Sequence, residues 1–110
     1  MRIIRLAEIR ESETAALFIG REHGAQVSFF ITSHRRGEGP DAHRHPYEET
    51  FVVQEGATEF TVDGATVELQ AGTVVVVPAD AVHSFKAASD GITRQVNIHP
   101  VPEMVTEWIQ

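Results

Sequence analysis

Short apolar runs separated by turn residues dominate the chain from position 17 onward and predict an all-β domain. The runs are four to eight residues long and rich in Val, Thr and Phe, and Gly, Pro, Asp and Ser gather between them. The expected strands are Leu17–Arg21, Val27–His34, Thr50–Gln54, Thr58–Val62, Thr66–Leu69, Thr73–Val77, His83–Ala87 and Thr93–His99. Eight short strands in a chain of this length are typical of a closed barrel or a double-sheet jelly roll.

Two local patterns add detail to this architecture. The dipeptide Asp63-Gly64 lies between two expected strands and predicts a tight hairpin, because these residues accept the positive φ angles of a two-residue turn. The run Thr73–Val77 is continuously apolar rather than alternating. We therefore expect both of its faces to be covered, either within the sandwich or by a second subunit.

The last eleven residues, 100–110, break the strand pattern. Pro100 and Pro102 end the last strand, and Met104 and Trp108 have the i,i+4 spacing of one helical face. We expect a short C-terminal helix or hook that covers a barrel mouth or packs on a neighbouring subunit. Because Trp and Met are enriched at buried interface centres, subunit packing in a homodimer is favoured over capping of the chain's own core.

Composition narrows the functional classes. The 110 residues predict one domain, 1–110, with an ordinary globular balance of 42% apolar and 23% charged residues. A net charge of −7 argues against nucleic acid or an anionic membrane as partner. The chain has no cysteine, which excludes disulfides and thiol catalysis. Charged residues interrupt the first twelve positions and no apolar run reaches membrane-spanning length, so a cytoplasmic location is expected.

Three residues of metal-ligand type stand within seven positions. His43 and His45 are two residues apart, so their side chains point to the same face of an extended chain. Glu49 follows His43 by six positions, an even offset that keeps this face if the chain stays extended. Imidazoles and a carboxylate suit a divalent transition ion. The alternative is a solvated strand face with coincidental spacing.

The same segment resembles the first sequence motif of the cupin superfamily. Residues 37–56 match every fixed position of that motif, which reads Gly37-x5-His43-x-His45-x3-Glu49-x6-Gly56. A second motif follows over residues 72–87 as Gly72-x5-Pro78-x-Asp80-x2-His83. Its match is partial, because Asp80 replaces the usual Gly and Ala87 stands where Asn is frequent.

The resemblance implies a cupin-type double-stranded β-helix, a jelly-roll barrel with a metal ion inside. It adds His83 to the three ligands of the first motif and so implies a four-ligand site: His43, His45, Glu49 and His83. Relatives of this kind favour Mn, Fe, Ni or Zn, and one divalent ion per chain is expected. The donor set itself does not select among these ions.

Several side chains are candidates for the surroundings of the ion. Phe51 and Val53 share the parity of Glu49, and Phe85 shares that of His83, so these three are expected to form an apolar shell beside the metal. Tyr47 is expected at the surface after Pro46. His34, His23 and the arginines Arg35, Arg36 and Arg94 are expected to be solvated, although any of the arginines could clamp an anion.

The last strand leaves two orientations open. Gln95, Asn97 and His99 alternate with Val96 and Ile98. If the apolar positions face outward, the polar ones line a pocket near the metal, and His99 can serve as a general acid or base. In the opposite orientation His99 lies on the surface.

Two functional hypotheses follow, and the complete ligand set argues against a third, a purely structural domain whose ligands are vestigial. The first is a metal-dependent enzyme acting on a small organic molecule, with dioxygenase-type oxidation favoured over isomerase or lyase chemistry and with Glu49 and His99 as catalytic residues. The second is a binding or sensing module in which the ion holds a small ligand. A polar, titratable group facing the metal favours the enzyme, whereas a dry apolar pocket favours the binding module.

Overall fold

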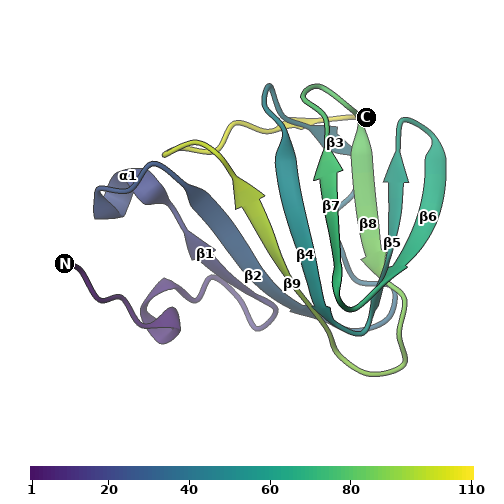
Figure 1. Ribbon diagram of the computed structural model, residues 1–110, viewed down its shortest axis with the longest axis horizontal. Helices are drawn as coiled ribbons and strands as arrows, with labels where there is room; N and C mark the ends of the chain where they lie inside the picture. Colours follow the sequence, from purple (N-terminus) through teal and green to yellow (C-terminus); the bar gives the residue numbers. More distant parts are fainter.

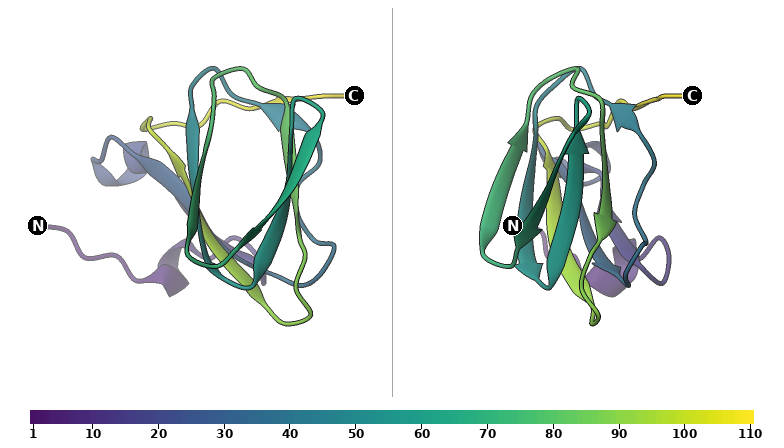
Figure 2. Two further views of the ribbon diagram at one scale, coloured as in Figure 1. Left: turned by 45° about the vertical axis from the view of Figure 1, so that its right-hand side comes forward. Right: turned by 90° about the vertical axis from the view of Figure 1, so that its right-hand side faces the viewer.

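Two antiparallel sheets of five strands each face one another in the computed structural model, which describes residues 1–110 (Figures 1 and 2). Sheet A has the order β1-β2-β9-β4-β7 and sheet B the order β10-β3-β8-β5-β6. The strands are β1 (Ala15–Phe18), β2 (Ser28–His34), β3 (His43–Arg44), β4 (Glu49–Glu55), β5 (Ala57–Val62), β6 (Ala65–Gln70), β7 (Thr73–Val77), β8 (His83–Ala87), β9 (Thr93–His99) and β10 (Glu107–Trp108). The predicted all-β jelly-roll barrel is confirmed.

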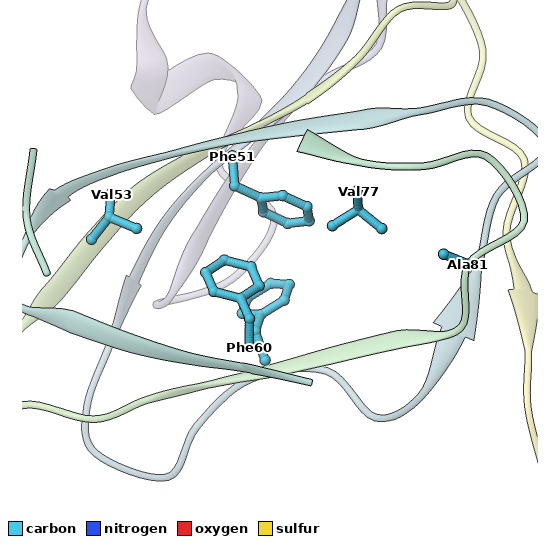
Figure 3. Packing of buried hydrophobic residues seen from close by; sticks show 6 residues of the cluster. Phe51, Val53, Phe60, Val77 and Ala81 are labelled. Carbon is cyan, nitrogen blue, oxygen red and sulfur yellow. The ribbon is translucent and has the colours of Figure 1, made fainter. Parts of the chain in front are cut away.

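The core lies between the sheets at one end of the barrel. Strand β4 buries every second residue, and its Phe51 packs edge-on against Phe60 of β5 at a centroid separation of 5.0 Å and Phe85 of β8 at 5.3 Å (Figure 3). Burial of one such aromatic side chain stabilises the fold by about 1.5–3 kcal/mol. The apolar core consists of Phe51, Val53, Phe60, Val77, Ala81 and Phe85.

The predicted hairpin at Asp63-Gly64 joins β5 to β6. Both residues have positive φ, 48° and 84°, and Val62 pairs with Ala65 across the turn. Such angles match the twist of a two-residue hairpin. The Asp63 carboxylate also accepts a hydrogen bond from the backbone of Val82, which ties the hairpin to the loop before β8.

The strand predicted over Leu17–Arg21 is wrong beyond Phe18. β1 covers Ala15–Phe18, and residues Gly20–His23 form a single helical turn, α1. Gly20 is buried with its Cα facing the carbonyl of Val27, which a Cβ would approach to 2.2 Å. Gly24 then ends the turn at φ 71° in the left-handed region. A second short turn, the 3₁₀ helix η1 (Leu6–Ile9), precedes β1.

A helix or a hook was predicted for the C-terminal tail, and the structure shows the hook. It runs along the end of the barrel where β3 lies (Figures 1 and 2). Its strand β10 pairs Glu107 with Arg44 and Trp108 with His43. Trp108 packs against the His43 ring with a centroid separation of 5.0 Å and remains 59% exposed. The tail therefore covers the mouth of its own barrel. The helix predicted from the i,i+4 spacing of Met104 and Trp108 does not form, because pairing with β3 holds Glu107 and Trp108 in a strand.

The continuous apolar run of β7 is not covered on both faces within the chain. β7 is the edge strand of sheet A, with Val75 and Val77 inward and Val74 and Val76 outward. Val74 and Val76 are 59% and 54% exposed. Coverage by the sandwich is thus wrong, and coverage by a second subunit stays a prediction. None of the helices has the length and apolar character that crossing a bilayer requires.

Candidate metal centre

The two motif segments meet at the open end of the barrel, but their ligands lie on strands of both sheets and not on one strand as predicted. His43 lies on β3 of sheet B, whereas Glu49 opens β4 of sheet A. The expectation of three ligands on one extended strand is therefore wrong, because the chain turns between His45 and Glu49 and crosses to the other sheet. His83 opens β8 and pairs directly with His43. The ligands converge from two sheets.

The four predicted metal ligands form one buried cluster. Their ligand atoms all lie within 4.8 Å of one another. The Glu49 Oε1 atom is 3.0 Å from His45 Nε2 and 3.2 Å from His83 Nε2. Each of the four residues is no more than 5% exposed. A buried carboxylate surrounded by imidazoles requires a positive charge nearby.

Backbone carbonyls orient the three imidazoles. The Nδ1 atom of His43 lies 2.7 Å from the Asp41 carbonyl, that of His45 2.8 Å from the Val105 carbonyl, and that of His83 2.9 Å from the Ala81 carbonyl. Because a carbonyl only accepts, each Nδ1 carries a proton and donates it. In the neutral rings the Nε2 lone pairs then point to the centre of the cluster, which is the tautomer that metal-binding histidines adopt.

An unsatisfied atom shows that the donor set fits a cation. The Nε2 atom of His45 is buried and has no hydrogen-bond partner in the protein. A buried polar atom without a partner is costly, and a divalent ion between Nε2 and the Glu49 carboxylate would satisfy it. His43, His45, Glu49 and His83 can therefore hold one divalent transition ion.

The electrostatics of the cluster keep the carboxylate ionised. Burial raises the pKa of Glu49, but the close imidazoles of His45, His83 and His99 outweigh burial and hold this pKa well below its ordinary value. Burial also lowers the pKa of His45, yet the Glu49 carboxylate beside its Nε2 and its hydrogen bond to the Val105 carbonyl raise that pKa overall. Burial lowers the pKa of His43. The cluster thus offers a negative oxygen and imidazole nitrogens that a cation can share.

His99 contacts the oxygen of Glu49 that the other histidines leave free. Its Nε2 lies 3.0 Å from Glu49 Oε2, and its Nδ1 lies 2.6 Å from the hydroxyl of Tyr47. The carboxylate only accepts, so His99 donates Nε2–H to Glu49, and in the neutral ring the Tyr47 hydroxyl donates to Nδ1. The Tyr47 oxygen in turn accepts from the backbone N–H of Val105 at 3.2 Å. The surface position predicted for Tyr47 is wrong.

The open orientation of the last strand is now resolved. Gln95, Asn97 and His99 are buried on the inner face of β9, and Val96 and Ile98 point outward. Val96 and Ile98 join Phe29, Ile31 and Val52 on the outer face of sheet A, whereas the inward side chains of β9 find polar partners in Thr58, Glu49 and Tyr47. Thr58 of β5 donates to the Gln95 side-chain oxygen at 2.8 Å, so the buried amide has a partner.

A cavity of about 400 Å³ opens beside the ligand cluster. Its wall includes His43, His45, Glu49 and His99 at the base, together with the following side chains above them: Phe30, Thr32, His34, Glu38, Phe85, Asn97, Thr106 and Trp108. The volume is within the range of roughly 300–1,000 Å³ that is usual for small-ligand sites.

The predicted pocket residues divide into two groups. Phe85 and Asn97 line the cavity, whereas Phe51, Val53 and Gln95 do not and lie behind its wall. Parity along a strand gives the inward face but not the depth, and these three side chains are on the core side of the ligands. His34, expected to be solvated, is part of the wall. Arg36 and Arg94 instead form surface ion pairs with Asp90 and Glu55.

Comparison with known proteins agrees with this geometry. The family model described as a cupin domain matches residues 30–99, most of the chain. The protein belongs to the cupin family. Among curated proteins, this cupin is 41% identical over 63 residues to the polyketide synthase CurC of Streptomyces cyaneus, a match that covers 56% of this chain and 41% of that protein. It is 36% identical over 50 residues to the dimethylsulfoniopropionate lyase DddW of Ruegeria pomeroyi, covering 46% of this chain and 33% of that protein.

Among solved structures, this cupin resembles the oxalate decarboxylase of Lactobacillus farciminis, solved as a formate complex. The TM-score is 0.82 at 21% identity, with 96% of this chain and 35% of that chain covered. The likeness shows a shared fold. The chain spans less than half the length of the curated relatives it matches.

Proposed function

We propose that this cupin is a divalent-metal-dependent enzyme that acts on a small organic molecule. The observation that carries the proposal is the contact between His99 Nε2 and Glu49 Oε2 at the base of the cavity. A titratable imidazole beside the ligand cluster, within a cavity of ligand size, provides what acid–base chemistry requires. A pocket that only binds or senses a ligand has no need of such a group.

Each residue has a defined part in this proposal. His43, His45, Glu49 and His83 hold the ion, for which Mn, Fe, Ni and Zn are the candidates. When bound, the ion supplies Lewis-acid polarisation of a substrate oxygen. Glu49 and His99 move the proton as a pair: Glu49 Oε2 is the accepting atom, and His99 Nε2 carries the proton that the pair can deliver.

Two further features support proton transfer at this position. The Tyr47 hydroxyl, 2.6 Å from His99 Nδ1, holds the imidazole ring in place and can respond to its change of protonation. Phe30, Phe85 and Trp108 in the cavity wall limit the access of water to the base. Both features keep the acid–base group aligned with a substrate bound above the cluster.

The positioned proton-transfer group favours lyase or isomerase chemistry, with a proton removed next to a carbonyl. One of the curated relatives is a lyase and another is a polyketide synthase by name, and both names are compatible with such chemistry. The dioxygenase-type reaction favoured from the sequence remains the alternative. It requires a redox-active ion and consumption of dioxygen, so the two reaction types are separable by experiment.

Exchange of a carbon-bound proton tests the proposal. 2′-Hydroxyacetophenone, the methyl ketone with an ortho ring hydroxyl, is incubated in D₂O with zinc-loaded protein, and loss of the methyl proton signal is followed by NMR while an oxygen electrode records dioxygen. The C–H bond breaks, the Glu49–His99 pair takes the proton at Glu49 Oε2, and a deuteron from solvent replaces it on the carbon. We expect exchange without oxygen uptake, and His99→Gln should slow it by about 10²–10⁴-fold.

The outcomes distinguish the three functions. Oxygen uptake by the iron-loaded protein with no exchange would assign the dioxygenase-type reaction instead. Binding of the ketone with neither exchange nor oxygen uptake would assign a binding module. Elemental analysis provides the metal control: a content below a few tenths of an ion per chain, not restored by added Mn, Fe, Ni or Zn, would contradict the metal site itself.

A further inference from the structure

The charged groups around the cavity disfavour an anionic ligand. The carboxylates of Glu38 and Glu49 both lie in the wall. Lys86, the nearest cation along β8, turns its Nζ to the Gly39 carbonyl at 2.6 Å and to Asp41 at 3.4 Å. Burial lowers the pKa of His34 in the wall, which favours its neutral form. The two carboxylates together offset the charge of a bound divalent ion, so the cavity is close to neutral.

A chain of directed hydrogen bonds sets the orientation of Asn97. The Thr58 hydroxyl donates to Gln95 Oε1 at 2.8 Å, and Gln95 Nε2 donates to Asn97 Oδ1 at 2.8 Å. The oxygen of the Asn97 amide is therefore engaged by the protein. Asn97 is 3% exposed and lines the cavity, and the side-chain hydrogen bond of its amide is the one that Oδ1 accepts from Gln95, which leaves Nδ2 for the cavity. The amide consequently offers a donor, not an acceptor, to whatever occupies the cavity.

Aromatic surface forms much of the remaining wall. Phe30 comes from β2 of sheet A, Phe85 from β8 of sheet B, and Trp108 from the C-terminal hook. These three elements approach the cavity from different sides, so a planar apolar body can be enclosed between rings. A hydrated ion or a sugar would leave this surface poorly matched.

We propose that the cavity binds an uncharged, aromatic molecule whose carbonyl or hydroxyl oxygen accepts a hydrogen bond from Asn97 Nδ2. The inference rests on the proposed function in using the same cavity and ion, and it names the substrate class for that site. Asn97 is then a specificity-determining residue. A ligand with an oxygen at this position pairs the donor that faces the cavity, whereas a ligand that lacks it displaces water from the donor without replacing the hydrogen bond.

Calorimetric titration of zinc-loaded protein with two matched probes tests the ligand class. 2′-Hydroxyacetophenone and salicylate share the ring and the ortho oxygen pair, but the first is neutral and the second carries a carboxylate. We expect the neutral ketone to bind at least tenfold more tightly. Equal or tighter binding of salicylate would overturn the proposal, and this comparison needs no variant.

The role of Asn97 is tested with a charge-matched control. Asn97→Asp replaces the donor by an acceptor of nearly the same shape and should raise the Kd for the ketone by about tenfold or more. Gln54→Glu makes the same chemical change at an exposed position of β4 and should leave binding unchanged. If Asn97→Asp does not fold, Thr58→Val provides the second test. It removes the hydroxyl that donates to Gln95 Oε1, so the hydrogen-bond chain no longer fixes the Asn97 amide, and ketone binding should weaken severalfold. Unaltered affinity in folded Asn97→Asp or Thr58→Val would refute the assignment.

The titration is independent of turnover. Failure of the ketone to exchange its methyl protons would contradict the proposed enzyme and leave the probe selectivity standing. Exchange with normal rates in a protein that prefers salicylate would contradict the ligand class and leave the enzyme standing.

Discussion

Glu49 is the residue on which the site depends, because one carboxylate serves two sets of partners. Its Oε1 atom faces His45 and His83, and its Oε2 atom faces His99. Three imidazoles within 3.2 Å of its oxygens keep its pKa low despite burial. The carboxylate can therefore bind an ion through one oxygen and hold the acid–base histidine through the other. The metal-ligand histidines His45 and His83 and the histidine of the proton-transfer pair therefore contact different oxygens of the same carboxylate.

Removing one ligand imidazole should reduce metal content and thermal stability together. His45→Ala deletes a ligand and the hydrogen bond to the Val105 carbonyl. An ion that binds the native state stabilises it by about 2.7 kcal/mol at a free concentration one hundred times Kd, and this contribution should be lost. Elemental analysis and thermal denaturation measure the two effects. His23→Ala, remote from the ligands, is the control for metal content. Lost metal with unchanged Tm would show that the site forms without the ion.

Removing the phenolic hydroxyl next to His99 should reduce turnover selectively. Tyr47→Phe keeps the ring, which stacks on His45, and deletes the hydrogen bond to His99 Nδ1. We expect unchanged metal content, an unchanged Kd for 2′-hydroxyacetophenone and a proton-exchange rate about tenfold lower, because the lost hydroxyl aligns His99 and otherwise pairs only with the backbone of Val105. A parallel loss of metal would indicate instead that Tyr47 supports the ligand cluster.

At the level of elements, the sequence predicted the long strands and the hairpin but not the short pairings that close the site. Runs such as Thr93–His99 show their period over seven residues, whereas β3 and β10 have two residues each and no detectable pattern. The metal ligands were found because their motif is local in sequence. The contact of His99 with Glu49, and of Tyr47 with His99, depends on which sheet face turns inward and on a turn after His45, which neither parity nor spacing determines.

The C-terminal hook should stabilise the metal site although it contributes no ligand. Its Val105 carbonyl accepts from His45, and its Val105 N–H donates to Tyr47. Deletion of residues 104–110 removes both contacts and the pairing of β10 with β3. We expect weaker metal binding by titration with a chromogenic chelator, and a lower Tm. Glu107→Gln, which breaks only an exposed ion pair with Arg44, should have little effect on either. Unchanged metal affinity after the deletion would limit the hook to covering the mouth.

Two glycines of the loop before β3 should differ in their tolerance of a side chain. A Cβ on Gly39 would meet the Phe85 carbonyl oxygen at 2.0 Å, whereas one on Gly37 would meet nothing within 4 Å. Both have positive φ, so both substitutions carry a conformational cost of about 1 kcal/mol or more. Gly39→Ala should lower the free energy of unfolding clearly further than Gly37→Ala in urea denaturation. Equal losses would show that the loop shifts to relieve the contact.

At the scale of the whole molecule, charge and apolar surface are unevenly distributed. Residues 1–10 contain three Arg and one Glu, a net charge of +2, so the remainder of this −7 chain carries −9. This basic segment extends away from the barrel in Figure 1. It also carries exposed apolar side chains, Ile3 at 80% and Leu6 at 46%. On sheet A, Val74 and Val76 present exposed apolar surface at the β7 edge.

We propose that these two features meet in a homodimer, in which the basic, apolar N-terminal segment of one copy lies against the acidic body of the other and sheet A packs through its outer face. Opposite charge and apolar surface on the same chain make a second copy the complementary partner. Sedimentation equilibrium should give a dimer at micromolar concentration. The double variant Val74→Lys/Val76→Lys should be monomeric, since two desolvated charges oppose contact. Val67→Lys, an exposed valine on the edge strand β6 of sheet B, should remain dimeric. A monomeric wild type, or dissociation by Val67→Lys alone, would contradict this arrangement.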